Sequence, residues 1–354
     1  MMKIAQVCHR YYPNVGGVER HVQEISKRLA EKFDVEVISA DRSRDRPQIE
    51  EIDGIKVTRF RSVSPNNAYF IAPQISSYIK KSDFDIVHAH NYHALPALFA
   101  SFGSKNKKFV FNPHYHGVGS TPFRDLLNKP YKIVGSTIFN RSNKIICDSN
   151  YEKNLVEKNF GFKDNIEIIP SGVDLKSIRS VKPFELDEKF MLYLGRLDKY
   201  KNIQCAIKAM KYLPEDFHFY IGGKGENFSE LKSMIGKLDL DSRVKLLGFV
   251  PEEDKYRWMK TCDVFVNLSG VEAFGITVLE ALASGAPAIV NAEGGLSEFA
   301  EKFGGVRSVQ PEKISAKVLA QEIERSIEKT INDDLNGYDW RSIIKKIEGV
   351  YKNL

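Results

Sequence analysis

Residues 1–39, MMKIAQVCHRYYPNVGGVERHVQEISKRLAEKFDVEVIS, contain the pattern that determines the fold. A short apolar run, KIAQVC (3–8), is followed by the segment VERHVQEISKRLAEK (18–32) and then by a second run, VEVIS (35–39). Apolar residues recur in the middle segment at spacings of three and four, at Val18, Val22, Ile25 and Leu29. This spacing gives a helix one apolar face, and a helix between two strands predicts a βαβ unit with a parallel sheet.

The same alternation of short strands and amphipathic helices continues along the chain. In the first half the further strand candidates are KVTRF (56–60), DIVHAH (85–90), KFVFN (108–112) and KIICDS (144–149). A second series comprises FMLYLGR (190–196), FHFYIGG (217–223), RVKLLGF (243–249), DVFVNLS (263–269) and APAIVNA (286–292). Charges and a proline interrupt both periodicities between about residues 176 and 189. We therefore expect two doubly wound α/β domains that meet there.

The size and composition agree with this organisation. The chain has 354 residues, more than one hydrophobic core usually serves. With 42% hydrophobic and 28% charged residues, it has the composition of a folded, soluble protein. No apolar run reaches the roughly 18 residues that cross a bilayer, and the first ten residues lack the apolar region of a signal peptide. We expect a cytoplasmic protein.

The cysteines and the charges exclude several classes of site. Four cysteines, without CxxC pairing, lie in or beside apolar stretches and are expected to be buried thiols: Cys8, Cys147, Cys205 and Cys262. The net charge is +6, and basic residues form two small clusters, Arg42, Arg44, Arg46 and Lys105, Lys107, Lys108. Such clusters are either solvated loops or a surface that attracts an anionic membrane or a phosphate-bearing substrate. No nucleic-acid-binding module is present, so we expect no nucleic-acid partner.

Ligands of open α/β sheets bind at the carboxyl ends of the strands, where several loops of this chain place glycine beside charge. Gly16 and Gly17 follow the first strand and open a helix, where a ligand can approach backbone N–H groups. Arg196 follows a strand and Lys201 precedes the next helix, and two such cations suit a diphosphate. Gly223 follows another strand. Each loop alone is also explained as a tight turn or as an exposed rim with an Arg196–Asp198 salt bridge.

The segment VEAFGITVLEALASGAPAIV (271–290) is more specific. Glu272 is expected in a loop after a strand, and Glu280 in the following helix among apolar residues. A buried carboxylate needs partners, and two carboxylates that face a sugar or a ribose can accept from its hydroxyls. Phe274 and Gly275 present backbone N–H groups at the helix entry to a phosphate or a hydroxyl. The alternative is a surface helix with ordinary acids, which the apolar neighbours disfavour.

Five motifs occur in order, namely GGVER (16–20), SGVD (171–174), GRxxxxKN (195–202), the E-x₇-E spacing (272–280) and a glycine pair followed by Glu298. Together they resemble the retaining glycosyltransferases of family four over nearly the whole chain. The resemblance implies the GT-B fold, with two Rossmann-like domains that face each other across a cleft. It also implies an acceptor domain, 1–180, a nucleotide-sugar donor domain, 181–337, and a C-terminal helix, 338–354, that crosses back to the first domain.

The resemblance implies roles in donor binding. Glu280 would bind the ribose, Glu272 would lie beside the transferred sugar, and Arg196 and Lys201 would hold the diphosphate and offset its charge as the glycosidic bond breaks. Gly223 belongs to the floor of the same pocket, and Phe274 and Gly275 address the sugar and the phosphate through the backbone. Ser171 and Ala273 depart from the family pattern without removing a charge.

In the first domain, the resemblance implies that the Gly16–Gly17 backbone approaches the donor phosphate or the acceptor. His114 is favoured over His116 as the residue that faces the donor sugar, although a loop histidine is more often structural. His88 and His90 are expected to shape the cleft or core of this domain. The acceptor loops would include Tyr11, Tyr12 and residues 117–132.

The expected reaction transfers a hexose-type sugar from a UDP- or GDP-sugar to an acceptor hydroxyl with retention of configuration. No metal is expected, since the sequence has no suitably placed DxD-like acidic pair and no convincing cluster of metal ligands. No cofactor besides the nucleotide sugar is expected. Front-face attack is favoured over double displacement, for which Glu272 is the candidate nucleophile. The alternatives are a nucleotide-sugar epimerase or hydrolase and an inactive sugar-nucleotide-binding protein. The acceptor is lipid-linked, a polysaccharide or a small molecule, and the basic clusters favour peripheral contact at the inner face of the cell membrane.

Overall fold

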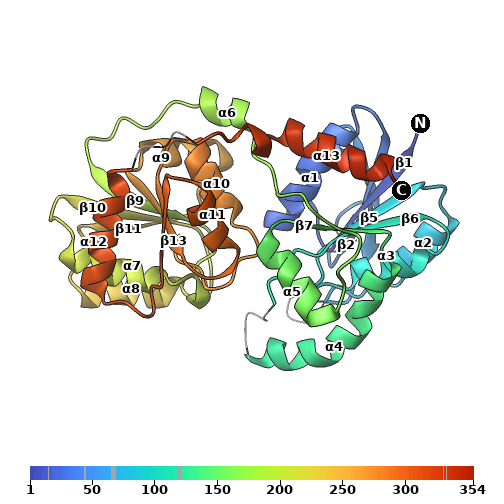
Figure 1. Ribbon diagram of the computed structural model, residues 1–354, viewed down its shortest axis with the longest axis horizontal. Helices are drawn as coiled ribbons and strands as arrows, with labels where there is room; N and C mark the ends of the chain where they lie inside the picture. The colour runs from blue at the N-terminus through green and yellow to red at the C-terminus, as the bar shows by residue number, and fades with distance from the viewer. Residues whose placement is uncertain (15, 44, 65–68, 118–121, 330, 332) are drawn as a thin grey trace. The chain divides into compact units, whose positions relative to one another are not determined.

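The computed structural model describes residues 1–14, 16–43, 45–64, 69–117, 122–329, 331 and 333–354. Arg44 and residues 118–121, which the sequence places in a basic cluster and an acceptor loop, lie outside the described residues. Contacts divide the chain into two units, Met1–Gly172 with Trp340–Leu354, and Val173–Asp339 (Figure 1). The boundary expected after residue 180 therefore falls inside the second unit, at the end of the short helix α6 (Leu175–Ser180).

The first unit has an eight-stranded sheet in the order β3-β4-β2-β1-β5-β6-β7-β8. Its strands are β1 (Lys3–Cys8), β2 (Asp34–Asp41), β3 (Ile49–Ile52), β4 (Ile55–Arg61), β5 (Ile86–His90), β6 (Lys108–Asn112), β7 (Lys144–Cys147) and β8 (Ile166–Ile168). The β3–β4 pair is antiparallel, while the other pairs are parallel. Asp53 and Gly54 connect β3 to β4 with φ angles of 54° and 75°, the left-handed conformation that a two-residue hairpin turn favours.

Helices cover both faces of this sheet. They are α1 (Gly17–Leu29), α2 (Gln74–Lys81), α3 (Pro96–Gly103), α4 (Pro122–Arg141), α5 (Asn150–Phe160) and α13 (Trp340–Lys352). The predicted apolar face of α1 is confirmed, since Val22, Ile25 and Leu29 are fully buried. Their cluster also contains Ile343 and Ile347 of α13, so the last helix of the chain packs beside α1 in the first unit (Figure 1).

The second unit has a six-stranded parallel sheet in the order β11-β10-β9-β12-β13-β14. Its strands are β9 (Lys189–Leu194), β10 (Phe217–Gly222), β11 (Val244–Gly248), β12 (Val264–Asn267), β13 (Ala288–Asn291) and β14 (Val306–Val309). Besides α6, its helices are α7 (Ile203–Ala209), α8 (Phe228–Lys237), α9 (Glu252–Thr261), α10 (Ile276–Ala283), α11 (Ser297–Lys302) and α12 (Ala316–Ile327). This strand order is that of a Rossmann domain, with the switch point between β9 and β12. The prediction of two doubly wound α/β units is confirmed.

Two further expectations concern the burial of the cysteines and the presence of membrane-spanning helices. Cys8, Cys147 and Cys262 are buried and free, as predicted, whereas Cys205 on α7 is partly exposed. Within the described ranges, no helix combines the length and the apolar character that a membrane span requires.

Candidate active site

In the second unit, the loops that leave β9 and β12 bring Lys201 and Glu272 together. Lys201 closes a 3-10 turn, Lys199–Lys201, after β9, and its ammonium group forms an ion pair with the Glu272 carboxylate, which follows β12. The two strands are neighbours on either side of the switch point. The pair thus lies where a doubly wound sheet binds ligands.

Arg196 lies on the same loop and is accessible. Its side chain is 71% exposed, and Nη1 lies 3.3 Å from Asp198 Oδ2, so the salt bridge considered as the alternative is present. The Tyr200 ring centroid lies 6.0 Å from the guanidinium carbon of Arg196 and 5.0 Å from Lys201 Nζ. The two cations therefore share one aromatic neighbour at the rim of the sheet.

Gly223 allows the loops after β9 and β10 to touch. It has φ +141°, and a Cβ there would lie 1.8 Å from the carbonyl oxygen of Gly195. Its N–H donates to the carbonyl of Gly248 at 2.6 Å, which fixes the exit of β10 against the exit of β11. A side chain at this position would push the loop that carries Arg196 out of place.

A second glycine pair, Gly294 and Gly295, packs against the backbone of the loop before α10. A Cβ on Gly295 would lie 2.1 Å from the carbonyl oxygen of Ala273, and the Gly295 N–H donates to the Glu272 carbonyl at 2.9 Å. Gly275 enters α10 with φ +100°, and its neighbour Phe274 packs against Phe299 with ring centroids 5.2 Å apart. The Phe274 side chain is thus part of the packing, and a contact between its backbone and a ligand stays a prediction.

Glu280 is buried, as its apolar neighbours suggest, but it has a protein partner that the sequence did not reveal. Its side chain is 3% exposed, and Oε1 accepts from Lys255 Nζ at 2.7 Å. Lys255 lies on α9 and also contacts Glu252 at 3.0 Å, a spacing of three residues that in sequence looks like an ordinary surface pair. The partner that a buried carboxylate needs is thus supplied by the protein, and the role of Glu280 in ribose binding stays a prediction.

In the first unit, the Gly16–Gly17 loop covers a buried acid. Glu19 is 1% exposed and lies 2.8 Å from Arg10 Nε and 3.3 Å from His9 Nε2. A Cβ on Gly16 would come within 2.5 Å of Glu19 Oε2, whereas a Cβ on Gly17 would meet no atom of the described residues within 4 Å. Gly17 is the more open position for a ligand.

His114 is held by an acid. Nδ1 lies 2.7 Å from Asp148 Oδ2. Burial lowers the pKa of His114, but the carboxylates of Asp148, Glu152 and Glu19 together outweigh it, and the pKa is raised overall. His116 instead stacks on His93 with centroids 4.3 Å apart. Close by, both carboxylate oxygens of Glu152 accept backbone N–H groups, those of Tyr115 and Asp148.

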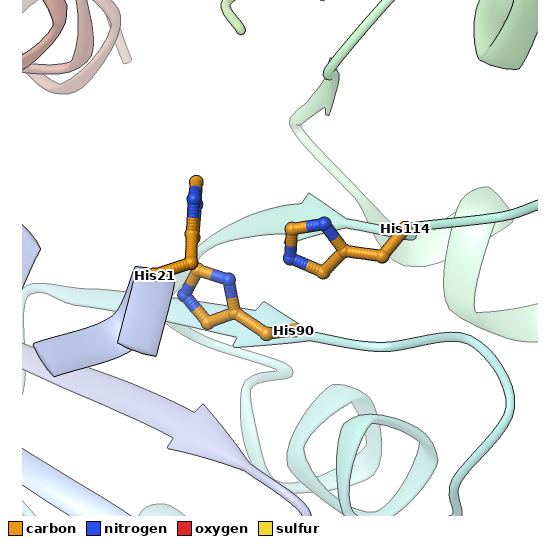
Figure 2. Close-up of side chains that lie close together, drawn as sticks. All are labelled: His21, His90 and His114. Atoms are coloured by element: carbon orange, nitrogen blue, oxygen red, sulfur yellow. The ribbon is translucent and has the colours of Figure 1, made fainter. Parts of the chain in front are cut away.

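Some expectations for the first unit need correction. Tyr11 is 1% exposed and belongs to the core beside α1, so its side chain does not line an acceptor loop. His88 and His90 need no correction, since both are fully buried and the expectation allowed a position in the core. The expectation of no metal-ligand cluster missed His21, which lies on α1 and meets His90 and His114 in space (Figure 2). Residues so far apart in sequence give no local signal of their meeting.

The chain matches two family models that adjoin in the sequence. The model described as Glycosyltransferase Family 4 matches residues 15–177, and the model described as Glycosyl transferases group 1 matches residues 174–336. Their junction lies within a few residues of the boundary between the units.

Individual glycosyltransferases are similar to this chain over nearly its whole length. The chain is 27% identical to the uncharacterized glycosyltransferase MJ1178 of Methanocaldococcus jannaschii, covering 97% of this chain and 96% of that protein. It is 25% identical to the phosphatidylinositol N-acetylglucosaminyltransferase GPI3 subunit of Saccharomyces cerevisiae, over 99% of this chain and 83% of that protein.

Solved structures share the fold. Sucrose-phosphate synthase from Thermosynechococcus elongatus superposes with a TM-score of 0.83 at 19% identity, over 100% of this chain and 99% of that one. Anabaena Alr3699/HepE, in complex with UDP-glucose, has a TM-score of 0.79 at 20% identity, with 100% of both chains covered. With two Rossmann-like units and both family models matched in order, the chain belongs to the family-four, group 1 glycosyltransferases of GT-B fold, which transfer sugar from a nucleotide-sugar donor.

Proposed function

We propose that the chain is a retaining hexosyltransferase that uses a UDP- or GDP-sugar and needs no metal ion at its donor site. The observation that carries this proposal is the Lys201–Glu272 ion pair at the switch point of the second sheet. The exposed guanidinium of Arg196 lies on the same loop. Two cations at this edge can balance a diphosphate, and a carboxylate beside them can accept from sugar hydroxyls.

Each donor residue has a distinct role in this proposal. Arg196 and Lys201 bind the diphosphate and stabilise its charge when the glycosidic bond breaks. Glu280 accepts from the ribose hydroxyls, and Lys255 neutralises its charge so that it can remain buried. Gly223, which has no side chain, and the backbone of Phe274 and Gly275 are assigned to contacts with the phosphates and the sugar.

The arrangement favours front-face attack. The acceptor oxygen bonds to the anomeric carbon on the side from which the phosphate leaves, and the departing phosphate oxygen takes the acceptor proton. Double displacement would need Glu272 as a nucleophile. Because its carboxylate is already paired with the Lys201 ammonium, its nucleophilicity is reduced, and we assign it to binding and to orienting Lys201.

Donor binding tests these assignments. Calorimetry with UDP-glucose, UDP-N-acetylglucosamine and GDP-mannose should identify one donor that binds the wild type. With that donor, Lys201→Ala should lower turnover about 100-fold, as the loss of a charge-stabilising group typically does. Glu280→Gln should raise the donor Kd. Lys199→Ala is the matched control, since Lys199 is an exposed residue of the same turn. Full activity in both site variants would refute the assignment.

Product analysis tests the reaction. An anomeric proton spectrum of the product should show the configuration of the donor sugar. Nucleotide released at the same rate without an acceptor, or an epimerised donor, would contradict transfer. Activity should survive exhaustive treatment with a chelator.

His114 is kept as the candidate that faces the donor sugar. The acceptor is assigned to the first unit, near Gly16 and Gly17, and we propose a lipid-linked acceptor. Two relatives have names that include a lipid, phosphatidylinositol in one and diphospho-undecaprenol in the other. Lys105 and Lys108 are exposed, whereas Lys107 donates to the Ser82 carbonyl at 2.7 Å. In this cluster, peripheral contact with the inner face of the cell membrane would therefore depend mainly on Lys105 and Lys108. Flotation with anionic liposomes at low salt should recover the protein, and a Lys105→Glu/Lys108→Glu variant should float less.

A further inference from the structure

Three histidine rings converge in the first unit, and they come from three separate segments. His21 lies on α1, His90 ends β5, and His114 follows β6 (Figure 2). One nitrogen of each ring lies within 4.8 Å of the nitrogens of the other two. His21 is 5% exposed, His90 is fully buried, and the His114 side chain is 11% exposed. Figure 2 shows the His114 ring turned toward the other two.

Each ring uses one nitrogen outward and leaves the other without a partner. The outward contacts are His21 Nδ1 with Ser171 Oγ at 2.8 Å, His90 Nε2 with Gln6 Oε1 at 2.8 Å, and His114 Nδ1 with Asp148 Oδ2 at 2.7 Å. Within the described part of the chain, no hydrogen-bond partner is found for the other buried nitrogens, which are His21 Nε2, His90 Nδ1 and His114 Nε2.

The outward partners fix the tautomers of two rings. The Gln6 amide nitrogen donates to the Tyr351 hydroxyl at 3.0 Å, so its oxygen faces His90 and accepts from Nε2–H. The Asp148 carboxylate likewise accepts from Nδ1–H of His114. In a neutral ring the second nitrogen then carries a lone pair. His90 therefore presents a lone pair inside the cluster. His114 presents one once a metal ion displaces the second proton of its ring. Ser171 can accept from His21 Nδ1–H, which leaves a lone pair on His21 Nε2.

We propose that His21, His90 and His114 bind a divalent transition-metal ion, with Zn²⁺ as the preferred ion. Neutral imidazole is a good ligand for zinc, copper and nickel, and three histidines with one open position are a known zinc arrangement. Histidines that bind metal usually donate their other N–H to a carboxylate, an amide or another acceptor, which is the outward pattern seen here. The buried carboxylate of Asp148 also supplies negative charge beside the cation.

The fit requires a modest movement. Zinc–nitrogen distances of about 2.0–2.1 Å place ligand nitrogens about 3.3 Å apart, closer than the 4.8 Å limit found here. His114 is the ring that can adjust, since it lies in a loop, while His21 and His90 are held on a helix and a strand. A single buried water with three nitrogen partners is the rival occupant.

The test uses the full-length chain after dialysis against a chelator. Titration with Co²⁺ should produce the visible absorption bands of four-coordinate cobalt at one equivalent per chain, and Zn²⁺ should abolish them. His114→Gln should lower the Zn²⁺ affinity measured by calorimetry at least about 100-fold. Asp148→Asn, a change in a positioning residue, should lower it about 10- to 100-fold. His218→Gln, in the second unit, should leave it unchanged.

The wild-type spectrum decides the question even if a variant fails to fold. Absence of visible bands at millimolar Co²⁺ would overturn the proposal and leave water as the occupant. Binding that a folded His114→Gln variant retains at full affinity would overturn it as well, because the ion would then occupy another site. Neither readout depends on transferase activity or on the donor site.

Discussion

The buried pair between Lys255 and Glu280 predicts unequal losses of stability when either partner is removed. Glu280 is 3% exposed and Lys255 is 13% exposed, with 2.7 Å between Nζ and Oε1. Lys255 has a further carboxylate at 3.0 Å, that of Glu252, whose side chain is 57% exposed. Loss of Glu280 therefore leaves Lys255 with a partner and a path to water. Loss of Lys255 leaves a carboxylate inside the core without its ammonium group.

Removing one partner of a buried ion pair costs about 3–5 kcal/mol. For Lys255→Met we expect a value near the lower end, about 3 kcal/mol, because Lys255 is not fully buried. For Glu280→Gln the shape is kept and one charged hydrogen bond is lost, so we expect about 1–2 kcal/mol. The double variant removes both charges, and we expect it to be about 2 kcal/mol more stable than the sum of the single losses.

The two tryptophans provide the assay. Trp258 lies on α9 in the second unit, and Trp340 begins α13 in the first, so a Trp340→Phe background reports on the second unit alone by fluorescence. Urea denaturation of the four members of the cycle in this background gives their free energies of unfolding. Glu252→Gln is the control, with an expected loss below about 0.5 kcal/mol. Equal losses for the two single variants, or additive losses in the double variant, would refute the reasoning.

Three further predictions concern stability, each measured by urea denaturation against a matched control. Gly223→Ala should lower the free energy of unfolding by about 4 kcal/mol, because its Cβ would collide with a backbone carbonyl and φ +141° strains any side chain. The control is Gly285→Ala, which has φ +92° and no atom of the described residues within 4 Å, and it should lower the free energy of unfolding by about 1–2 kcal/mol. Glu152→Gln should lower the free energy of unfolding by about 2 kcal/mol, because the NH₂ group of the new side chain would face a backbone N–H that the carboxylate now accepts. Glu157→Gln, on the same helix, is the control and should change the free energy of unfolding little. Burial, opposed by a nearby carboxylate, lowers the pKa of His9 to about 4, so the stability that neutral His9 contributes is complete above about pH 6.5 and is lost as the pH falls toward 4. When the pH falls from 7.5 to 5, the free energy of unfolding of the wild type should decrease by about 2 kcal/mol more than that of His9→Gln. Equal decreases would contradict this prediction.

The alternation of strands and helices was readable from sequence because buried parallel strands and amphipathic helices have different periods. The face of α1 and the edges that carry Arg196, Lys201 and Glu272 follow from that alternation, since parallel strands end at a common edge. The hairpin at Asp53 and Gly54 was missed, although an Asp-Gly pair between two segments that contain β-branched residues is a turn signal. Local reasoning about strands could have found it.

Other features needed the packed structure. Lys255 meets Glu280 because α9 and α10 pack side by side, and its spacing from Glu252 gives it the appearance of a surface residue. His90 and His114 were each interpreted alone, and His21 was hidden in a regular amphipathic helix. A histidine in isolation carries no information about its neighbours, so no pattern along the chain predicts where three rings will meet.

The histidine cluster and the Lys201–Glu272 pair occupy equivalent places in their sheets. In the first sheet the order β2-β1-β5 reverses direction between β1 and β5, and in the second the order β10-β9-β12 reverses between β9 and β12. His90 ends β5, and Glu272 follows β12. At a switch point the connections run to opposite sides, so the strand ends between them are left free of crossing helices. Polar side chains can lie there without displacing the apolar core. In the first unit these are the three histidines, whose nitrogens can bind a cation, and in the second unit they are Lys201 and Glu272, whose charges can bind a ligand.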